Sequence, residues 1–396
     1  MTQPRTITAI AAIGDVADQN CWSGIPYHFY TASRRQGWQA AAIRLPVEEM
    51  KSPRLAWNLK QLLRGHGRGG YQYSSDFQTW AWKRTAPTFD PSHVLSFHAF
   101  FPAWRDLEKN NGQLSLYLDA THELLLDRYN LREHVSKWMQ QEMLKREREA
   151  LHQARRLIFF QRWAAKSAIE SYGINSSNVF VVLPGANLEV PANFRMADMA
   201  AEPGLVRPLY LGFVGKDWRR KGFLKLLVVV EGLARMGIKV ILRCAGSIPD
   251  EAQQHPCVEY RGFISKKDRL ADLLNLMASC DFGCLLSDAE ASSIAILEFL
   301  RLGVPVISTI VDGMGDLVPP DAGIRILPDA SSSEIAEMIA QCVRNPDRMA
   351  GLRGNARRWA GLMTWDRCVR EIDQVLAEGK LNGSVRPWLG LAGLQA

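Results

Sequence analysis

The 396-residue sequence predicts an α/β protein built of two doubly wound, Rossmann-like domains. Short apolar segments, typical of strands that are covered on both faces of a parallel sheet, alternate with helical segments along most of the chain. A stretch rich in proline and small residues, Glu189–Pro208, divides this series into two halves of ordinary domain size. We therefore expect one domain at residues 1–200 and a second at 201–376, with residues 377–396 returning to the first.

The chain opens on a strand, a loop and a helix. Ile7–Ile13 (ITAIAAI) predicts a buried first strand, and a loop that contains Gly24 follows it. Pro26 then begins a helical run that ends at Gly37. In a doubly wound domain this loop lies at the carboxyl edge of the sheet, where ligands bind. The loop has no G-x-G-x-x-G sequence, so it does not predict a dinucleotide site.

The segment Lys51–Arg84 differs from its surroundings in composition. It holds seven lysines and arginines but only one acid, Asp76, and four glycines interrupt its middle. Aromatic residues are interleaved with the basic ones: Trp57, Tyr71, Tyr73, Trp80 and Trp82. Two interpretations are open. The segment is either a solvated, irregular insertion whose tryptophans pack on the domain, or a surface that faces the acceptor or a membrane, since tryptophan and basic residues suit the lipid–water interface.

Further strands are predicted in the first half at His93–Phe97, Leu114–Leu118, Arg156–Phe160 and Val179–Leu183. Asp119 directly follows the second of these, and His98 and His122 also lie near strand ends. A single histidine in a loop is more often structural than catalytic, so both histidines have a structural explanation beside the functional one. The polar segment Leu131–Arg155 predicts a surface helix without chemistry.

The second half repeats the strand, loop and helix. Leu209–Val214 (LYLGFV) predicts a strand and Phe223–Met236 a helix, with the charged loop GKDWRRKG between them. A solvated turn would have the same composition, but the carboxyl end of a strand is where a phosphate ligand should lie. Strands are also predicted at Lys239–Cys244, Val258–Arg261 and Phe282–Leu286.

One apolar helix is flanked by two glutamates. Glu290 and Glu298 stand eight residues apart in EASSIAILEFLRLGVPVIS, with Ser292 or Ser293 suited to be the N-cap. Taken alone, such a pair is most simply a solvated loop acid and a salt-bridged helix acid. If Glu298 is buried among its aliphatic neighbours, it needs a partner, either an arginine or the hydroxyls of a ligand. The free N–H groups of Ser292–Ile294 are suited to a phosphate.

The complete pattern resembles a known family. An acid, small residues, an apolar helix with a second acid, and then G-V-P-V-I resemble the E-x7-E element of family 4 (group 1) glycosyltransferases, whose GT-B fold has two Rossmann-like domains facing a cleft. The loops WSGIPY and GKDWRRKG resemble those of one branch of the family. The resemblance implies that Glu290 contacts the donor sugar and that Glu298 holds the ribose hydroxyls. Ser292-Ser293 replaces the Phe-Gly that is frequent in the family, which keeps the amide donors and can alter sugar choice.

The resemblance also implies a site for the donor diphosphate. Lys216 and Lys221 match the two cations that neutralise it, and Arg220 could substitute for either. Gly215 is the glycine of the family's F-V-G element in front of these cations. Gly24 of the first loop would also lie close to the diphosphate.

Three more positions take their roles from the resemblance. The turn at Phe263 and Ile264 matches the one that accepts the nucleotide base through backbone groups and stacking. Asp119 falls where the family often has a histidine that faces the transferred sugar, although aspartate is used in the branch that this chain resembles.

The implied activity is a retaining, metal-independent hexosyl transfer in polysaccharide biosynthesis. The donor would be a UDP- or GDP-sugar, the acceptor a glycan, a lipid-linked molecule or another compound, and no cofactor would be permanently bound. Retention follows from the family and not from the residues. Two alternatives remain open: a GT-B-like binding protein without catalysis, and a nucleotide-sugar epimerase.

Composition restricts the partners. The net charge of +7 favours anionic ones, such as a nucleoside diphosphate, an acidic polymer or an anionic membrane surface. No nucleic-acid recognition motif accompanies this charge. The seven scattered cysteines include no C-x-x-C, which indicates reduced thiols and no metal site. Since the sequence has no signal-peptide pattern and no apolar run of ~18 residues, we expect a cytoplasmic protein that is at most peripheral on the inner membrane face.

Overall fold

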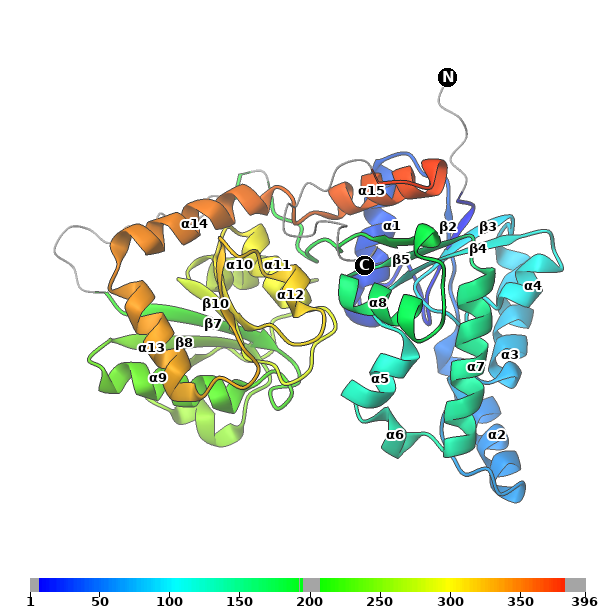
Figure 1. The fold of residues 1–396 in the computed structure, drawn as a ribbon, viewed down its shortest axis with the longest axis horizontal. Coiled ribbons are helices and arrows are strands. Elements are labelled where there is room, and N and C mark those ends of the chain that lie inside the picture. Colours follow the sequence, from blue (N-terminus) through cyan, green and yellow to red (C-terminus); the bar gives the residue numbers. More distant parts are fainter. Residues whose placement is uncertain (1–6, 192, 195–206, 382–396) are drawn as a thin grey trace. The chain divides into compact units, whose positions relative to one another are not determined.

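The chain forms two compact units (Figure 1). A computed structural model describes residues 7–191, 193–194 and 207–381. The first unit takes in Met1–Pro184 and Trp365–Ala396, and the second takes in Gly185–Thr364. Each unit holds one six-stranded sheet, and all strand pairs in both sheets are parallel. The predicted α/β class with two doubly wound units is therefore confirmed.

The sheet of the first unit has the order β2-β1-β3-β4-β5-β6. Its strands are β1 (Ala9–Ala11), β2 (Ala41–Ala42), β3 (His93–Ser96), β4 (Gln113–Leu118), β5 (Arg156–Phe159) and β6 (Val179–Val181). β1 pairs with β2 on one side and with β3 on the other, so the strand order reverses at β1. The loops that follow β1 and β3 diverge at this reversal, which in open α/β sheets forms the crevice where ligands bind.

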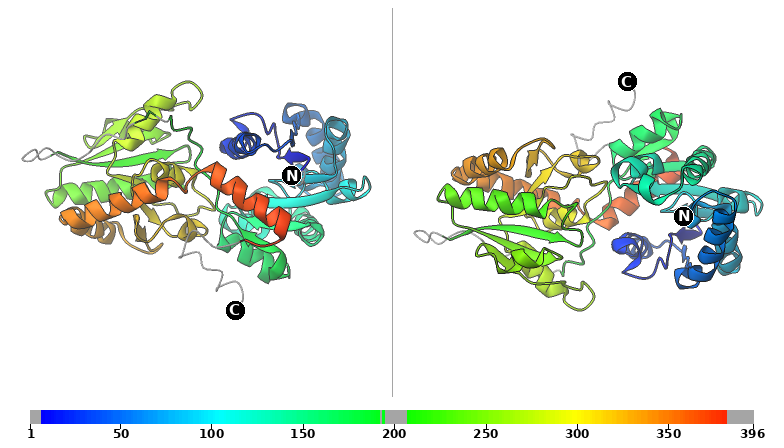
Figure 2. Two further views of the ribbon diagram at one scale, coloured as in Figure 1. Left: turned by 90° about the horizontal axis from the view of Figure 1, so that it is seen from above. Right: turned by 90° about the horizontal axis from the view of Figure 1, so that it is seen from below.

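Helices lie against both faces of this sheet (Figures 1 and 2). The helices of this unit are α1 (Ile25–Arg35), α2 (Lys51–Leu63), α3 (Ser75–Thr85), α4 (Trp104–Glu108), α5 (His122–Arg128), α6 (Leu131–His134), α7 (Lys137–Gln153), α8 (Arg162–Glu170) and α15 (Trp365–Glu378). Short 3-10 turns lie at Cys21–Gly24, Val47–Met50, Tyr71–Tyr73, Ala86–Thr88 and Ser176–Asn178.

The last helix belongs to the first unit. α15 packs along α1, because one face of it is apolar and becomes buried there. Arg35 of α1 also donates hydrogen bonds to both carboxylate oxygens of Asp366, at 3.1 and 3.2 Å. The return of the chain thus begins at Trp365, earlier than the expected residue 377. The expected boundary at residue 200 lies outside the described residues, whereas the two units divide after Pro184.

The basic, aromatic-rich segment is not irregular, so that part of one interpretation was wrong. Residues Lys51–Leu63 form α2 and Ser75–Thr85 form α3, with the glycines in the turn between them. Trp57 is buried, as the packing of tryptophans on the domain required. The predicted helix at Leu131–Arg155 is also divided, because the backbone of Val135 is extended between α6 and α7.

The sheet of the second unit has the order β12-β11-β10-β7-β8-β9. Its strands are β7 (Leu209–Gly215), β8 (Val240–Gly246), β9 (Val258–Tyr260), β10 (Phe282–Leu285), β11 (Val306–Thr309) and β12 (Gly323–Ile326). Its helices are α9 (Phe223–Arg235), α10 (Leu270–Ala278), α11 (Ile294–Arg301), α12 (Met314–Leu317), α13 (Ser332–Val343) and α14 (Pro346–Ala360), with a 3-10 turn at Asp250–Gln254. Here the strand order reverses between β7 and β10.

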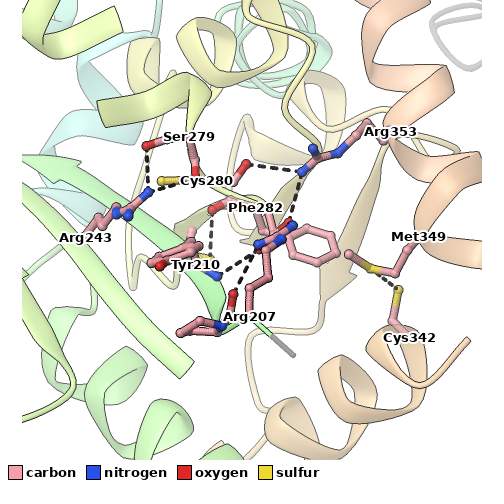
Figure 3. Close-up of polar contacts among 12 residues, drawn as sticks. Arg207, Tyr210, Arg243, Ser279, Cys280, Phe282, Cys342, Met349 and Arg353 are labelled. Carbon is pink, nitrogen blue, oxygen red and sulfur yellow. Dashed lines mark hydrogen bonds and ion pairs between the residues drawn. The ribbon is translucent and has the colours of Figure 1, made fainter. Parts of the chain in front are cut away.

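A buried carboxylate ties three segments of the second unit together. Asp281, just before β10, accepts two hydrogen bonds from Arg207 at 2.7 and 2.8 Å and one from Arg353 of α14 at 3.1 Å. Arg207 and Arg353 approach from different elements (Figure 3). The backbone N–H of Tyr210 on β7 donates another hydrogen bond at 2.9 Å. These bonds compensate the cost of burying the charge and hold the strand beginnings in register.

Within the described residues, no helix has both the length and the apolar character that crossing a membrane requires.

Candidate functional site

Two loops meet where the strand order of the second unit reverses. One follows β7 and carries the charged sequence 216–221, and the other follows β10 and leads to α11. The backbone N–H of Asp288 in the second loop donates to the carbonyl oxygen of Arg220 in the first, at 3.0 Å. Since ligands of open α/β sheets bind at such a reversal, the two loops frame the candidate site.

Glu290 is the centre of an ion cluster between these loops. Its side chain is buried, with 6% of the residue exposed. Its Oε2 accepts hydrogen bonds from Arg220 Nη1 and Lys221 Nζ, both at 3.0 Å. Arg220 Nη1 also donates to the carbonyl oxygen of Ala289 at 2.7 Å, and the Glu290 N–H donates to Asp312 Oδ2 at 3.0 Å. Arg220 also pairs with Asp217 Oδ2 at 3.2 Å, so the two cations are balanced by two carboxylates in this state. An anionic ligand can bind here by taking Arg220 or Lys221 as a partner in place of a carboxylate.

Glycines permit this arrangement. A Cβ at Gly215 would overlap Cδ of Lys221, so a larger residue there would displace the lysine stem from the end of β7. Gly222 has a φ of +68°, and a Cβ there would collide with the carbonyl of Leu286. Glycine at position 222 is therefore required for the loop after β7 to approach the loop after β10, and Gly215 leaves the space that the Lys221 stem fills.

The start of α11 has unsatisfied polar groups. Ser293 is the N-cap residue, as predicted, but its hydroxyl accepts no capping hydrogen bond. The hydroxyl oxygens of Ser292 and Ser293 are both buried and have no hydrogen-bond partner among the described residues. Buried polar atoms without partners are uncommon and destabilising. Together with the free backbone N–H groups of the first helical turn, they suit a ligand with anionic or hydroxyl oxygens.

Glu298 lies inside α11 and is 2% exposed. Its partner is Lys266, whose Nζ forms an ion pair with Oε1. Burial raises the pKa of the Glu298 carboxyl, and the charges of Lys266 and Lys221 counteract that rise. The sequence predicted an arginine or a ligand as the partner of Glu298, but it did not predict Lys266. The available signal was the Lys-Lys pair two residues after the turn at Ile264.

An exposed aromatic ring, that of Phe263, lies just after β9, which pairs with β8. Phe263 is 63% exposed, and the Nζ of Lys216 lies 5.4 Å from its ring centroid. Ile264 beside it is buried. The turn is fixed by a hydrogen bond from the Gly246 N–H to the Gly262 carbonyl at 2.9 Å. A ring that is exposed in a fixed turn can stack on a planar ligand group.

In the first unit, the loop after β1 has an unusual backbone. Trp22, Ser23 and Gly24 have φ angles of 42°, 58° and 85°. Two consecutive non-glycine residues in the left-handed region are strained, and such strain is common at binding sites. The Trp22 ring is held against Phe97 and Phe160, at centroid distances of 5.9 and 6.0 Å. Gly24 is buried and precedes α1 directly.

The other predicted residues of the first unit lie after β3 and β4. Asp119 is partly buried just beyond β4. His122 is buried, and its Nδ1 lies 2.8 Å from Glu147 Oε1, while its backbone N–H donates to the same carboxylate. Removal from water and the neighbouring His122 lower the pKa of His98 to about 3. The Nδ1 of His98 accepts a hydrogen bond from the N–H of Phe100 at 3.2 Å. These contacts give each histidine a structural role.

Of the predicted site residues, the structure thus brings Arg220 and Lys221 into contact with Glu290. The side chain of Lys221 also packs against Gly215. The resemblance paired Lys216 with Lys221, but Lys216 lies over Phe263, and Arg220 is the second cation on Glu290.

The described residues contain no group of three or more His, Cys, Asp and Glu side chains that could hold a metal ion. All seven cysteines lie in this part of the chain and are free thiols.

Comparison with known sequences gives matches to glycosyltransferases. Residues 208–345, most of the second unit, match the family model described as "Glycosyl transferases group 1". A curated relative, the D-inositol 3-phosphate glycosyltransferase of Corynebacterium urealyticum, is 24% identical over 221 residues, which cover 51% of this chain and 52% of the relative. The match thus spans about half the length of this relative.

Comparison with solved structures covers both units. The sucrose-phosphate synthase of Thermosynechococcus elongatus superposes with a TM-score of 0.68 at 15% identity, over 94% of this chain and 98% of that one. Anabaena HepE, solved in complex with UDP-glucose, gives a TM-score of 0.55 at 17% identity, over 76% and 82% of the two chains. At these identities the likeness shows the fold, which is that of GT-B glycosyltransferases.

Proposed function

We propose that this chain is a glycosyltransferase that moves a sugar from a nucleoside-diphosphate sugar to an acceptor. The observation that carries the proposal is the cation cluster of Arg220 and Lys221 on Glu290, beside the unsatisfied start of α11. The group 1 glycosyltransferase model covers both loops of this site, and HepE, a protein of similar fold, has been solved with UDP-glucose.

Each group at the site has a task in this proposal. Lys221, with Lys216 or Arg220, neutralises the diphosphate, and the N–H groups and hydroxyls of Ser292 and Ser293 add hydrogen bonds to its oxygens. As the donor bond breaks, negative charge grows on the leaving diphosphate, so cations placed there in advance stabilise the transition state. We propose that these protein groups do this without a metal ion.

The remaining donor contacts follow the resemblance to family 4. Glu290 would accept from hydroxyls of the donor sugar and Glu298 from the ribose, while Phe263 and Ile264 would meet the base. Gly24 and Asp119 of the first unit would lie near the diphosphate and the transferred sugar. The retaining course of the reaction rests on the family alone.

For the acceptor we propose only a class of compound. It is a glycan, a lipid-linked molecule or another hydroxyl compound, and a role in polysaccharide biosynthesis follows from that class. A location on the inner face of a membrane fits such an acceptor.

Nucleotide binding provides the direct test. We expect titration calorimetry to detect UDP or GDP, with UDP the first choice because of the HepE complex. Lys221→Met keeps the stem over Gly215 and removes the charge, so it should weaken nucleoside-diphosphate binding roughly ten- to a hundredfold, the effect of about 1.5–3 kcal/mol for a charged hydrogen bond.

Two controls make this test specific. Binding of uridine or guanosine, which have no phosphate, should be unchanged in Lys221→Met, and Lys239→Met, an exposed lysine at the start of β8, should bind like the parent. Equal loss of nucleoside and nucleotide binding would indicate a general structural defect. Absence of binding to either diphosphate by the folded parent would contradict the proposal.

A panel of nucleotide sugars then separates the activities. A glycosyltransferase should slowly hydrolyse at least one of them even without its acceptor, whereas an epimerase would convert one sugar into another. A binding protein would leave all of them intact.

A further inference from the structure

Helix α2 presents an apolar face to solvent. Four leucines on this face have exposed fractions of 73% (Leu55), 60% (Leu59), 39% (Leu62) and 83% (Leu63). Their spacing places them on one side of an α-helix, opposite the buried Trp57 and Gln61. Ser52 and Ala56, which are also exposed, lie on the same side, so this face carries no charge. We call it the leucine face. Single exposed leucines are ordinary, but four on one face of a short helix indicate a binding surface.

Basic residues border the leucine face. Those in α2 and the following turn are exposed: Lys51, Arg54, Lys60, Arg64 and Arg68. Only Lys60 has an acidic neighbour within this segment, Asp76 at 3.8 Å, and both side chains are about half exposed, so the pair is weak. The surface around the leucines is therefore strongly positive.

Two cavities open beside this surface. One has a volume of about 650 Å³ and is lined in part by Lys51, Arg54 and Leu55, so it adjoins the leucine face directly. The other, of about 740 Å³, is lined in part by Arg68, and its lining includes Arg132 and Lys137. Gly69 lines both. The first hollow has cations and no acid in its lining. The second also contains Glu133, and its Arg132 pairs with Asp127, so the first hollow is better suited to a phosphate group.

The turn between α2 and α3 is rigidly held. A Cβ at Gly67 or Gly70 would press on Ser136 or Met139, and one at Gly69 would collide with the His134 carbonyl, so the turn packs closely against the chain before and at the start of α7. The Gly69 N–H also donates to Asn58 Oδ1 at 3.0 Å. His66 stacks on Trp138 at a centroid distance of 4.2 Å. The two hollows beside this turn are therefore formed before anything binds.

We propose that the leucine face docks on an anionic phospholipid membrane. An interfacial helix has an apolar face that enters the boundary between headgroups and acyl chains, and basic residues along its flanks that contact lipid phosphates. α2 has both, and the hollow lined by Lys51 and Arg54 accepts a headgroup phosphate. In Figure 1, α2 lies at an end of the first unit.

The alternative occupant, a second copy of this chain, fits less well. A symmetric contact through the leucine face would bring the basic borders of two copies together, and like charges would repel. Four leucines of one short helix also provide a small area for a stable dimer. The inference rests on the first unit alone, so it stands whether or not the chain transfers a sugar.

Vesicle sedimentation tests the inference. The full chain should bind vesicles of phosphatidylcholine with phosphatidylglycerol and should bind pure phosphatidylcholine vesicles much more weakly, and the binding should fall as salt is raised. The triple variant Leu55→Ser, Leu59→Ser, Leu63→Ser should lose roughly tenfold or more in partition coefficient, because three apolar side chains no longer enter the lipid. Since all three are exposed in solution, the fold should be retained.

Matched variants separate the contributions. Leu224→Ser with Val228→Ser removes two exposed apolar residues from α9 of the second unit and should leave vesicle binding unchanged. Lys60→Ser with Arg64→Ser and Arg68→Ser should abolish the preference for anionic vesicles. None of these variants should alter the affinity for UDP.

Three results would overturn the inference. One is vesicle binding by the leucine variant equal to that of the parent, and another is no binding of anionic vesicles by the parent. The third is a dimer of the parent in light scattering that the leucine variant converts to a monomer, which would assign the face to a second copy.

Discussion

At the scale of single residues, the candidate donor site is organised by buried carboxylates that already have cationic partners. Glu290 pairs with Arg220 and Lys221, and Glu298 pairs with Lys266. Without those partners, the burial of each charge would cost several kcal/mol. A ligand that reaches this site therefore meets side chains that are positioned in advance and need little reordering, which favours binding.

Substitution of Glu298 tests its contact with the ribose. Glu298→Gln keeps the volume and can still accept hydrogen bonds, but it loses the charge-assisted part of them. We expect nucleotide affinity to fall by roughly 1.5–3 kcal/mol, about ten- to a hundredfold in the dissociation constant. Calorimetry should be done at a temperature where the variant is fully folded.

Lys266→Met is the companion to this variant, because it removes the partner and leaves the carboxylate. If Glu298 mainly serves the ion pair, both variants should lower the melting temperature similarly and leave the folded protein's nucleotide affinity intact. A folded Glu298→Gln variant that binds as tightly as the parent would remove the ribose assignment.

His98 should make the stability of the protein depend on pH. Its pKa is about 3 in the folded chain, against an ordinary value of 6.5. The unfolded chain therefore binds an extra proton at intermediate pH, and the contribution of the neutral ring is complete above pH 6.5 and is lost as the pH falls toward 3. At pH 5 the loss amounts to up to about 2 kcal/mol.

His98→Asn is the variant that checks this effect. The Asn oxygen can replace Nδ1 as acceptor for the N–H of Phe100, now at 3.2 Å, but it does not titrate. Urea unfolding at pH 7.5 and pH 5 should show a smaller drop in the free energy of unfolding for the variant. An equal drop in parent and variant would show that other groups cause the acid sensitivity.

At the scale of elements, the site depends on where strands end and helices begin. β7 ends at Gly215 and α11 begins after Ser293. The loop after β7 holds the cations of the cluster, and the loop before α11 holds its carboxylate. The strand beginnings at the opposite edge are tied by Asp281, which joins Arg207, β7 and α14. Asp281 thus stabilises the element order at one edge of the sheet, and the candidate site lies at the other edge.

Removal of the Asp281 charge should destabilise the second unit. Asp281→Asn leaves Arg207 and Arg353 without their common anion, and we expect a loss of roughly 2–3 kcal/mol, below the ~3–5 kcal/mol of a fully buried pair because both arginines are partly exposed. Urea unfolding measures the loss. Asp272→Asn, which removes a solvent-exposed pair with Arg269, should cost less than about 1 kcal/mol. Equal stability of both variants would contradict the structural role of Asp281.

At the scale of the whole molecule, the two units have similar parallel sheets but carry different candidate binding surfaces. In the second unit, the reversal of strand order between β7 and β10 places the candidate donor site. In the first, the reversal at β1 exposes the strained loop at Gly24, while α2 extends a separate surface with leucines and cations. The net charge of +7 is consistent with both proposed anionic partners, a nucleoside diphosphate and a lipid surface.

The sequence alone determined the fold class and the strand ends at which polar side chains gather. This was possible because apolar runs and helical spacing are local properties of the backbone. The start of α11 at Ser292 or Ser293 followed in the same way, and the structure selects Ser293. The sequence also indicated that Lys51–Arg84 is unusual in composition. It did not indicate that the leucines of this segment form one exposed face.

Only the tertiary structure decided which distant side chains meet. Arg220 and Lys221 lie 70 and 69 residues before Glu290, and Lys266 lies 32 residues before Glu298. No local pattern connects such pairs, because their contact depends on the order of strands in the sheet. The same holds for α2, since its leucine face is exposed only because Trp57 on the opposite side packs into the first unit.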